Sequence, residues 1–338
     1  MEKAFAASVR SCLFAGALAF GGMLAAATAG AQDLKLKLTF PTDVATFELP
    51  YFIANDTGWF KEHGLAVEEI WVVGDANALR TVLSGDSDVT VVGLPTAFDG
   101  ILAGANIVCI GSWQPVVDYQ LVGKKGTIQT LKDFEGKTLS SAEPGGLTTE
   151  LPRMVMQKHG LDADSVKFIK VGGHGDRLRA VVAGKTEGAM INTLTATKGS
   201  LDGDVVILTA LATEFPGLAY VQLVVDRGSL QDADKRKALE IFLEGSIYGA
   251  RFIMDNPDRA AEIFHKRIPS MDPSLIRSVI GELNKINVWG VNGGAEPEVV
   301  SYTIEVSTQL GMLKQPLDVN QVLDRSLVEE ILARTGTR

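Results

Sequence analysis

Hydrophobic positions follow two alternating patterns over most of the chain. Short runs rich in β-branched residues, such as Val67–Val73 and Val89–Val92, are typical of buried strands. Between them lie segments with apolar residues at helical spacing, such as Ala78–Leu83. Strands that alternate with helices favour parallel sheets joined by right-handed crossovers. The pattern therefore predicts an α/β fold.

This α/β pattern occurs twice. Four positions of one segment recur at a constant offset of 99, as Leu79/Leu178, Arg80/Arg179, Val82/Val181 and Gly85/Gly184. Upstream, the offset of 99 also relates Val67, Ile70, Val72 and Gly74 to Val166, Ile169, Val171 and Gly173. Before both copies a helical segment ends at a His-Gly pair, and that glycine is typical of a left-handed helix C-cap. The repetition predicts two lobes built on the same plan.

The order of these segments also predicts how the chain is divided. Residues 32–122 and 222–338 are expected to form lobe 1, and residues 123–221 to form lobe 2. Two extended apolar segments, Asp118–Gly123 and Ala219–Val225, read as paired linker strands between the lobes. From Asp232 onward the periodicity is helical only, so we expect this tail to coat the first lobe.

The N-terminus has the pattern of a cleaved secretory signal peptide over residues 1–31. Lys3 and Arg10 form a basic region before an apolar stretch at residues 12–28. Ala29-Gly30-Ala31 then provides small residues for cleavage. We therefore expect export to the periplasm, with a retained N-terminal anchor as the alternative. No later segment is apolar for long enough to span a bilayer, so no stable membrane insertion is expected.

Charge and cysteine content narrow the function further. The whole chain has a formal charge of −9, and removal of Glu2, Lys3 and Arg10 with the signal gives −9 − 1 = −10. Such an acidic protein is not expected to bind nucleic acid. Cys109 would be the one cysteine left, in an apolar run, and is predicted to be a buried core residue.

Several of these segments resemble a known family. Gly58–Val67 followed by Leu79–Val92, and then Leu131–Lys137, are similar to signature segments of periplasmic solute-binding proteins of the nitrate/sulfonate/taurine and thiamine-precursor type. The resemblance implies a type II clamshell of two lobes, each a mostly parallel sheet flanked by helices, joined by two hinge strands. It also implies a small solute in the inter-lobe cleft. The partners it implies are the inner-membrane permease of an ABC importer and its ATPase.

The site can be predicted from the fold class. Ligands of open parallel sheets bind beyond the carboxyl ends of the strands, against helix N-termini. In the first lobe this rule indicates Thr42, Asp43, Thr46, Asp75, Leu94, Thr96 and Trp113. In the second lobe it indicates Glu143, Gly145, Gly146, Leu147, Thr148, His174, Asn192 and Thr193.

The predicted site has an excess of acidic residues. Carboxylates lie in or near its loops, and the loops contain no Lys or Arg before Arg177; the acidic positions are Asp43, Asp75, Asp118, Glu143 and Asp176. A solute with an amine or amino-heterocycle could pair with a carboxylate and stack on Trp113. A sulfonate-, taurine- or nitrate-like solute would depend on backbone donors and threonines, and it stays the other possibility.

The sequence lacks the patterns of common catalytic sites. It contains no His-Glu-x-x-His, no Gly-x-Ser-x-Gly and no P-loop. We expect no catalytic residue, no metal and no cofactor, and we expect His63, His159 and His265 to be structural. The alternatives are a ligand-sensing input protein for a membrane receptor and a pyrimidine-synthase-like enzyme on the same fold.

Overall fold

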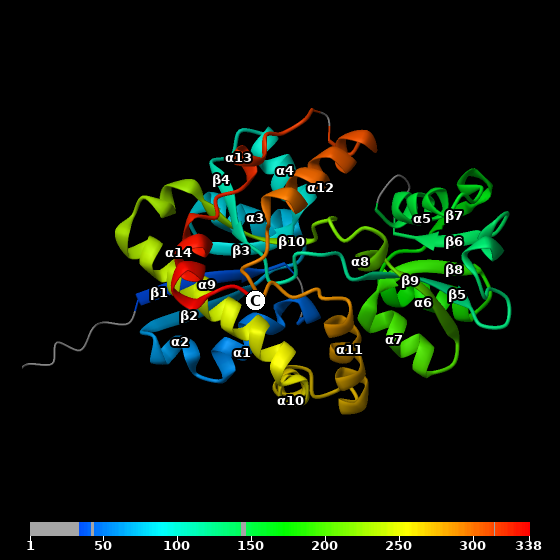
Figure 1. Cartoon of the computed structure of the whole chain (residues 1–338), viewed down its shortest axis with the longest axis horizontal. Helices are drawn as coiled ribbons and strands as arrows, with labels where there is room; N and C mark the ends of the chain where they lie inside the picture. The colour runs from blue at the N-terminus through cyan, green and yellow to red at the C-terminus, as the bar shows by residue number, and fades with distance from the viewer. Residues whose placement is uncertain (1–33, 42–43, 143–146, 314) are drawn as a thin grey trace, which may run out of the picture. The chain divides into compact units, whose positions relative to one another are not determined.

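The computed structural model describes residues 34–41, 44–142, 147–313 and 315–338. These residues form two five-stranded sheets, each flanked by helices, in two separate lobes (Figure 1). The two-lobed α/β fold predicted from the sequence is thereby confirmed. The predicted signal peptide lies outside the described residues. The predicted lobe boundaries at residues 122/123 and 221/222 stay a prediction.

The first lobe is built on a mixed sheet. Its order is β2-β1-β3-β10-β4, with β2 at Leu65–Trp71, β1 at Leu34–Phe40, β3 at Val89–Gly93, β10 at Val221–Asp226 and β4 at Ile107–Gly111. β1 runs parallel to β2 and β3, whereas β10 runs antiparallel to β3 and β4. The register of β1 with β2 extends from Leu34 opposite Leu65 to Phe40 opposite Trp71.

The second lobe repeats this topology. Its order is β7-β6-β8-β5-β9, with β7 at Lys167–Lys170, β6 at Thr138–Ser141, β8 at Gly188–Asn192, β5 at Tyr119–Lys124 and β9 at Val205–Ala210. β5 is the antiparallel strand here, in the place that β10 has in the first sheet. β3 and β8 begin at Val89 and Gly188 and end at Gly93 and Asn192, so the offset of 99 is kept in three dimensions. The duplication predicted from the sequence is confirmed.

The two linker segments differ from the prediction. They do not pair along their length, because β5 lies inside the second sheet and β10 lies inside the first. The bridge that the structure gives nearby joins Val116, which precedes the first segment, to Ala219 at the start of the second. Nearly all residues of both strands are buried, and a central place in a sheet satisfies such strands better than a linker would. Each of these two strands therefore directly follows a segment of the other lobe and begins a segment of its own lobe.

Helices cover both faces of each sheet. In the first lobe, one core cluster receives residues from α1 (Leu49–Asp56), α9 (Ala233–Asp255), α10 (Pro257–Arg267), α11 (Pro273–Lys285) and α14 (Ser326–Thr335). The other cluster receives residues from α3 (Asp75–Ser84), α4 (Leu94–Leu102), α12 (Pro297–Gln309) and α13 (Val319–Val322). In the second lobe, the clusters include α5 (Leu147–Lys158), α6 (His174–Val182), α7 (Thr193–Leu201) and α8 (Leu211–Glu214). The short helix α2 (Trp59–Glu62) precedes β2.

The helical tail is not confined to the first lobe as expected. α11 contacts α7, and Val306 of α12 belongs to a core cluster of the second lobe. The helical periodicity expected from Asp232 onward is also interrupted near the C-terminus, between α13 and α14. Leu323 is extended and bridges to Cys109, which is fully buried as predicted, and the chain then resumes as α14.

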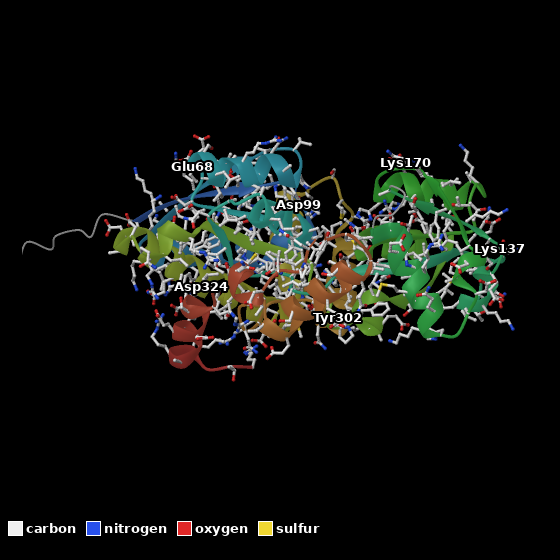
Figure 2. The ribbon with its side chains drawn as sticks, turned by 90° about the horizontal axis from the view of Figure 1, so that it is seen from above. Glu68, Asp99, Lys137, Lys170, Tyr302 and Asp324 are labelled. Carbon is white, nitrogen blue, oxygen red and sulfur yellow. The ribbon has the colours of Figure 1, made fainter. Side chains whose placement is uncertain are left out.

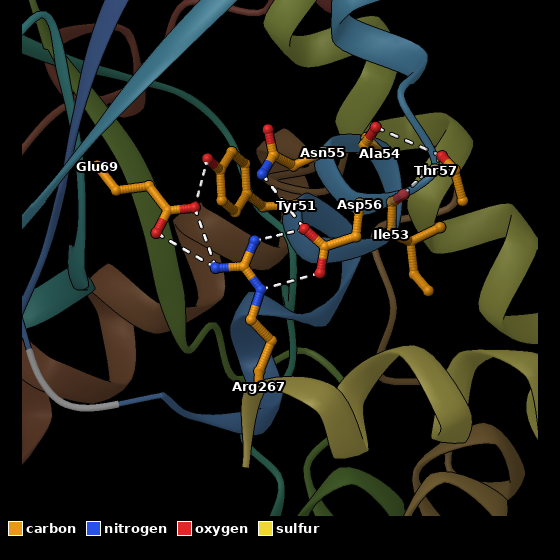
Figure 3. Close-up of polar contacts among 8 residues, drawn as sticks. All are labelled: Tyr51, Ile53, Ala54, Asn55, Asp56, Thr57, Glu69 and Arg267. Atoms are coloured by element: carbon orange, nitrogen blue, oxygen red, sulfur yellow. Dashed lines mark hydrogen bonds and ion pairs between the residues drawn. The ribbon is translucent and has the colours of Figure 1, made fainter. Parts of the chain in front are cut away.

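Within the first lobe, an ion-pair cluster holds α10 against α1 and β2 (Figure 3). The Arg267 guanidinium donates through Nε to Asp56 at 2.9 Å and through a terminal nitrogen to Glu69 at 3.2 Å. A second terminal nitrogen completes a bidentate pair with Asp56. Tyr51 donates to the same Glu69 at 3.0 Å, and the guanidinium lies 4.6 Å from the ring centre of Phe52. α1, β2 and α10 are thus joined by one cation.

Charged side chains project from the outer surfaces of both lobes (Figure 2). Glu68 and Asp99 project from the first lobe, and Lys137 and Lys170 from the second. Within the part of the chain that the structure describes, no helix combines the length and apolarity needed to cross a membrane.

Candidate functional site

A cavity of about 550 Å³ is lined by residues of both lobes. Its lining contains side chains at the carboxyl ends of strands and at the starts of helices, where the fold class predicts a site. The first lobe contributes Thr46, Asp75 and Thr96, and the second contributes Leu147, His174 and Asn192. The two linker segments and α12 complete the lining.

The duplicated fold places Asp75 and His174 at equivalent positions. They are the first residues of α3 and α6. Asp75 Oδ2 accepts a hydrogen bond from the backbone N–H of Gly93 at 2.8 Å. His174 Nδ1 accepts one from the backbone N–H of Asn192 at 3.0 Å. Each lobe therefore ties the start of a helix to the end of the next strand, and this contact brings both side chains to the cavity.

Two carboxylates give the cavity its charge. Burial raises the pKa of Asp75, although the Gly93 N–H and the Thr96 hydroxyl act in the opposite direction. Burial raises the pKa of Asp118 to about 6, although the nearby Thr193 backbone and Gln114 side chain act in the opposite direction. Neither carboxylate forms an ion pair with a residue that the structure describes. With a pKa of about 6, Asp118 is mainly ionised at pH 7.

His174 is neutral and has a defined tautomer. Burial, helped by the charge of Arg177, lowers its pKa to about 4. An Arg177 terminal nitrogen donates to His174 Nδ1 at 2.8 Å, and the Asn192 N–H donates to the same atom. A guanidinium only donates, so Nδ1 is an acceptor and the proton of the neutral ring is on Nε2. Arg177 itself is buried behind this ring and does not line the cavity.

Aromatic rings form a further part of the lining. Tyr119 makes edge contacts with His174 and Tyr220, at ring-centre distances of 5.1 Å and 5.8 Å. Tyr220 in turn meets Phe47 edge-on at 6.2 Å. Burial raises the pKa of Tyr119 and of Tyr220, and the nearby Asp118 raises both further, so the phenols stay protonated. They provide apolar faces and hydroxyl groups together.

The predicted site residues divide into three groups. Six line the cavity, namely Thr46, Asp75, Thr96, Leu147, His174 and Asn192. Four are buried and do not line it, namely Leu94, Trp113, Thr148 and Thr193. Five lie outside the described residues, namely Thr42, Asp43, Glu143, Gly145 and Gly146.

The two buried threonines have backbone partners. The Thr148 hydroxyl accepts from the N–H of Ala142 at 2.8 Å, and the Thr193 hydroxyl donates to the carbonyl of Asp118 at 2.6 Å. They hold the chain around the cavity and do not present a hydroxyl to it.

Trp113 requires a correction. From the sequence we expect its ring to stack on a flat solute, but the side chain is 1% exposed and does not line the cavity. It packs among Phe40, Tyr51 and Phe242, and its Nε1 donates to the hydroxyl of Ser246 at 2.8 Å. Trp113 is a core residue of the first lobe.

Two parts of the lining are not predicted from the sequence. Tyr119 and Tyr220 are cavity residues, and the signal for them was their matching place at the start of the two extended segments. Helix α12 and the residues after it contribute Thr303, Val306, Ser307, Leu310 and Met312. The sequence predicts the tail to be a helical coat of the first lobe, and its periodicity does not indicate this third wall. The described residues hold no group of three or more His, Cys, Asp or Glu placed to bind a metal.

Comparison with known proteins gives the same architecture. The family described as NMT1/THI5 like matches residues 46–260. YtlA of Bacillus subtilis (strain 168) is 20% identical over 298 residues, which cover 84% of this chain and 86% of YtlA.

Two solved structures are similar in fold. The periplasmic aliphatic sulphonate binding protein SsuA of Escherichia coli has a TM-score of 0.68 at 13% identity, covering 86% of this chain and 92% of SsuA. The periplasmic nitrate-binding protein NrtA of Synechocystis PCC 6803 also has a TM-score of 0.68 at 13% identity, covering 90% of this chain and 89% of NrtA.

Proposed function

Since the chain belongs to the NMT1/THI5 like family, we propose that it is the extracytoplasmic solute-binding component of an ABC-type importer. It captures a small organic solute in the cavity between its lobes and delivers it to an inner-membrane permease driven by an ATPase. The predicted signal peptide supports a periplasmic location.

The observation that supports this function best is the shared lining of the cavity. Asp75 and Thr96 come from one lobe, His174 and Asn192 come from the other, and two crossovers connect the lobes. A relative movement of two lobes about such crossovers opens and closes the space between them. Closure surrounds a solute on all sides and removes water from its polar contacts.

Binding fits this site better than catalysis. The solved neighbours SsuA and NrtA are described as binding proteins. The neutral His174 has its Nδ1 occupied by two donors, so it is not arranged as a base toward the cavity. SsuA binds aliphatic sulphonates and NrtA binds nitrate by their descriptions, but the acidic cavity of this chain would repel either anion. A sensory role uses the same geometry and is the second candidate.

The test is to identify the solute and then to follow its uptake. Native mass spectrometry of the purified protein should show a bound small molecule that denaturation releases unchanged. Cells that lack the gene should take up the labelled solute more slowly than the parent. A chemically converted molecule would indicate an enzyme, and unchanged uptake with loss of a transcriptional response would indicate a sensor.

A matched pair of variants on α12 tests whether the solute binds in this cavity. Ser307 lines the cavity, so Ser307→Trp should fill part of it and abolish solute retention. Ser301 lies exposed on the same helix, and Ser301→Trp should retain the solute. Circular dichroism of both variants checks that they fold. Equal retention by the two variants would contradict a site in this cavity.

A further inference from the structure

We propose that the solute is a cation with an apolar body, whose positive charge is held by Asp75 and Asp118 and whose body lies against α12. This inference rests on the proposed function and specifies the class of solute that the cavity selects.

The first argument is the charge of the lining. Asp75 and Asp118 both line the cavity, and no Lys or Arg side chain does so among the described residues. Both carboxylates act on the same neighbour, because each raises the pKa of Tyr220. Asp118 is 2% exposed, so its charge is removed from water without a protein cation to balance it. A buried charge of this kind is costly unless a partner is supplied, and a bound cation supplies one.

Arg177 is a cation in contact with the lining residue His174. Its guanidinium is buried, and it donates to the carbonyl of Gly172 at 2.5 Å and to His174 Nδ1. These contacts hold it behind the His174 ring. The face toward the cavity is a neutral imidazole, and the two carboxylates remain the charged groups that a solute meets.

The second argument comes from the duplication. The hydrogen bond from Gly93 to Asp75 could be read as a purely structural contact. In the second lobe, however, the equivalent contact from Asn192 is accepted by a neutral histidine. The fold therefore does not need a charge at this position. The carboxylate of Asp75 is in excess of what the strand-to-helix contact requires, and it faces the cavity.

The third argument is the apolar wall. Hydrophobic side chains from the second lobe, the crossover and the end of α12 line one part of the cavity, namely Leu147, Leu194, Leu218, Val306, Leu310 and Met312. A volume of about 550 Å³ is in the range of pockets that enclose drug-sized molecules, roughly 300–1,000 Å³. A solute that consisted of a charged group alone would leave these side chains uncovered. The combination selects a molecule with a charged end and an apolar end.

Isothermal titration of the purified protein at pH 7 with four probes tests this class. The probes are 4-butylbenzylamine, benzylamine, 4-butylbenzyl alcohol and 4-butylbenzoate. We expect 4-butylbenzylamine to bind at least tenfold tighter than benzylamine, because each buried methylene adds roughly fourfold. We expect it to bind at least tenfold tighter than the alcohol, because an ionic hydrogen bond is lost, and tighter still than the acid.

Variants test the role of the two carboxylates and the role of the apolar wall separately. Asp75→Asn and Asp118→Asn keep an oxygen acceptor and should each weaken the amine about tenfold or more, while binding of the neutral alcohol changes little. Asp176→Asn is the matched control, because Asp176 is exposed, pairs with Arg179 and does not line the cavity. The isosteric Val306→Thr should reduce the advantage of the butyl group and leave benzylamine binding unchanged.

The results that would overturn the proposed class of solute differ from those that would overturn the importer function. Tighter binding of the acid, affinity independent of the butyl group, or no binding of any amine would each overturn the inference. An anionic solute found by native mass spectrometry would overturn it and leave the importer function intact. Normal uptake in the deletion strain would overturn the importer function even if the amines bind.

Discussion

A single buried carboxylate gives the protein a measurable pH dependence. The pKa of Asp118 is about 6 in the folded protein, against 3.8 for an ordinary aspartate, because burial disfavours its charge. The titratable groups beside it are Tyr119 and Tyr220, and Asp75 acts on the same two tyrosines. Since the folded pKa is raised, Asp118 contributes stability below pH 4 that is lost as the pH rises through 6.

Asp118→Asn removes this contribution. The rise in pKa corresponds to about 3 kcal/mol. The free energy of unfolding of the wild type, minus that of the variant, should therefore fall by up to this amount as the pH rises from 4 to 7. Urea unfolding of the solute-free protein at pH 4.0, 5.5 and 7.0 measures the difference. A difference that stays constant across these values would contradict a raised pKa.

The residue scale also shows where sequence reasoning succeeds and fails. Asp75 and His174 could be placed because they begin matched helices, and strand ends and helix starts meet in this fold class. Trp113 could not be placed, because it follows a strand of the cleft region but its ring turns into the core. Local sequence predicts the position of a Cα well, but the direction of a side chain is decided by partners distant in the sequence.

Among the helices, the crossing of α1 and α9 depends on one glycine. A Cβ on Gly249 would lie 1.9 Å from the carbonyl oxygen of Pro50, which is backbone and cannot move alone. Gly249→Ala should therefore force the helices apart and lower the free energy of unfolding by at least about 2 kcal/mol. Gly281, within α11, has no neighbour within 4 Å of a built Cβ.

Gly281→Ala is the control for this prediction. It should stabilise the protein by roughly 0.5–1 kcal/mol, because alanine is the better helix former. Urea unfolding of both variants measures the two effects, which are expected to have opposite signs. A stable Gly249→Ala variant would show that α1 and α9 do not need their close contact.

The ion-pair cluster of α10 should also contribute to stability. Arg267→Met leaves Asp56 and Glu69 without their cation, and each carboxylate is 22% exposed. We expect a loss of about 1–3 kcal/mol, in the lower half of that range because water screens the remaining charges. Arg267→Lys should restore only part, because lysine cannot make the bidentate contact.

The comparison within the same helix is Arg259, which pairs with Glu262 at the surface. Both of these side chains are more than half exposed, so Arg259→Met should change the free energy of unfolding by less than about 0.5 kcal/mol. Thermal and urea unfolding measure both substitutions. Equal effects would mean that burial does not strengthen the Arg267 cluster.

At the same scale, periodicity predicted most strands and helices but not their neighbours. The strands β1, β3 and β4 were readable as apolar runs, whereas the insertion of β5 and β10 into sheets was not. Strand pairing joins residues far apart in the sequence, and one apolar run fits a linker as well as a sheet centre. The interruption at Leu323 likewise depends on its bridge to Cys109, which no local pattern indicates.

For the whole molecule, a solute in the shared cavity should stabilise both lobes. At a concentration 100 times the dissociation constant, binding adds about 2.7 kcal/mol to the free energy of unfolding. For a folded chain of about 300 residues this raises the melting temperature by about 4 °C. Scanning calorimetry should show every unfolding transition shifted upward. If only one of two transitions moved, the solute would contact one lobe alone.

The late position of β10 in the sequence sets the order in which the two sheets can be completed. All five strands of the second sheet lie in one continuous stretch, from Tyr119 to Ala210. The first sheet has β3 and β4 early, but the strand between them, β10, begins only at Val221. Because domains fold as units during synthesis, the second sheet has all its strands before the first does. The first lobe begins synthesis first, but its sheet is therefore the last to have all of its strands.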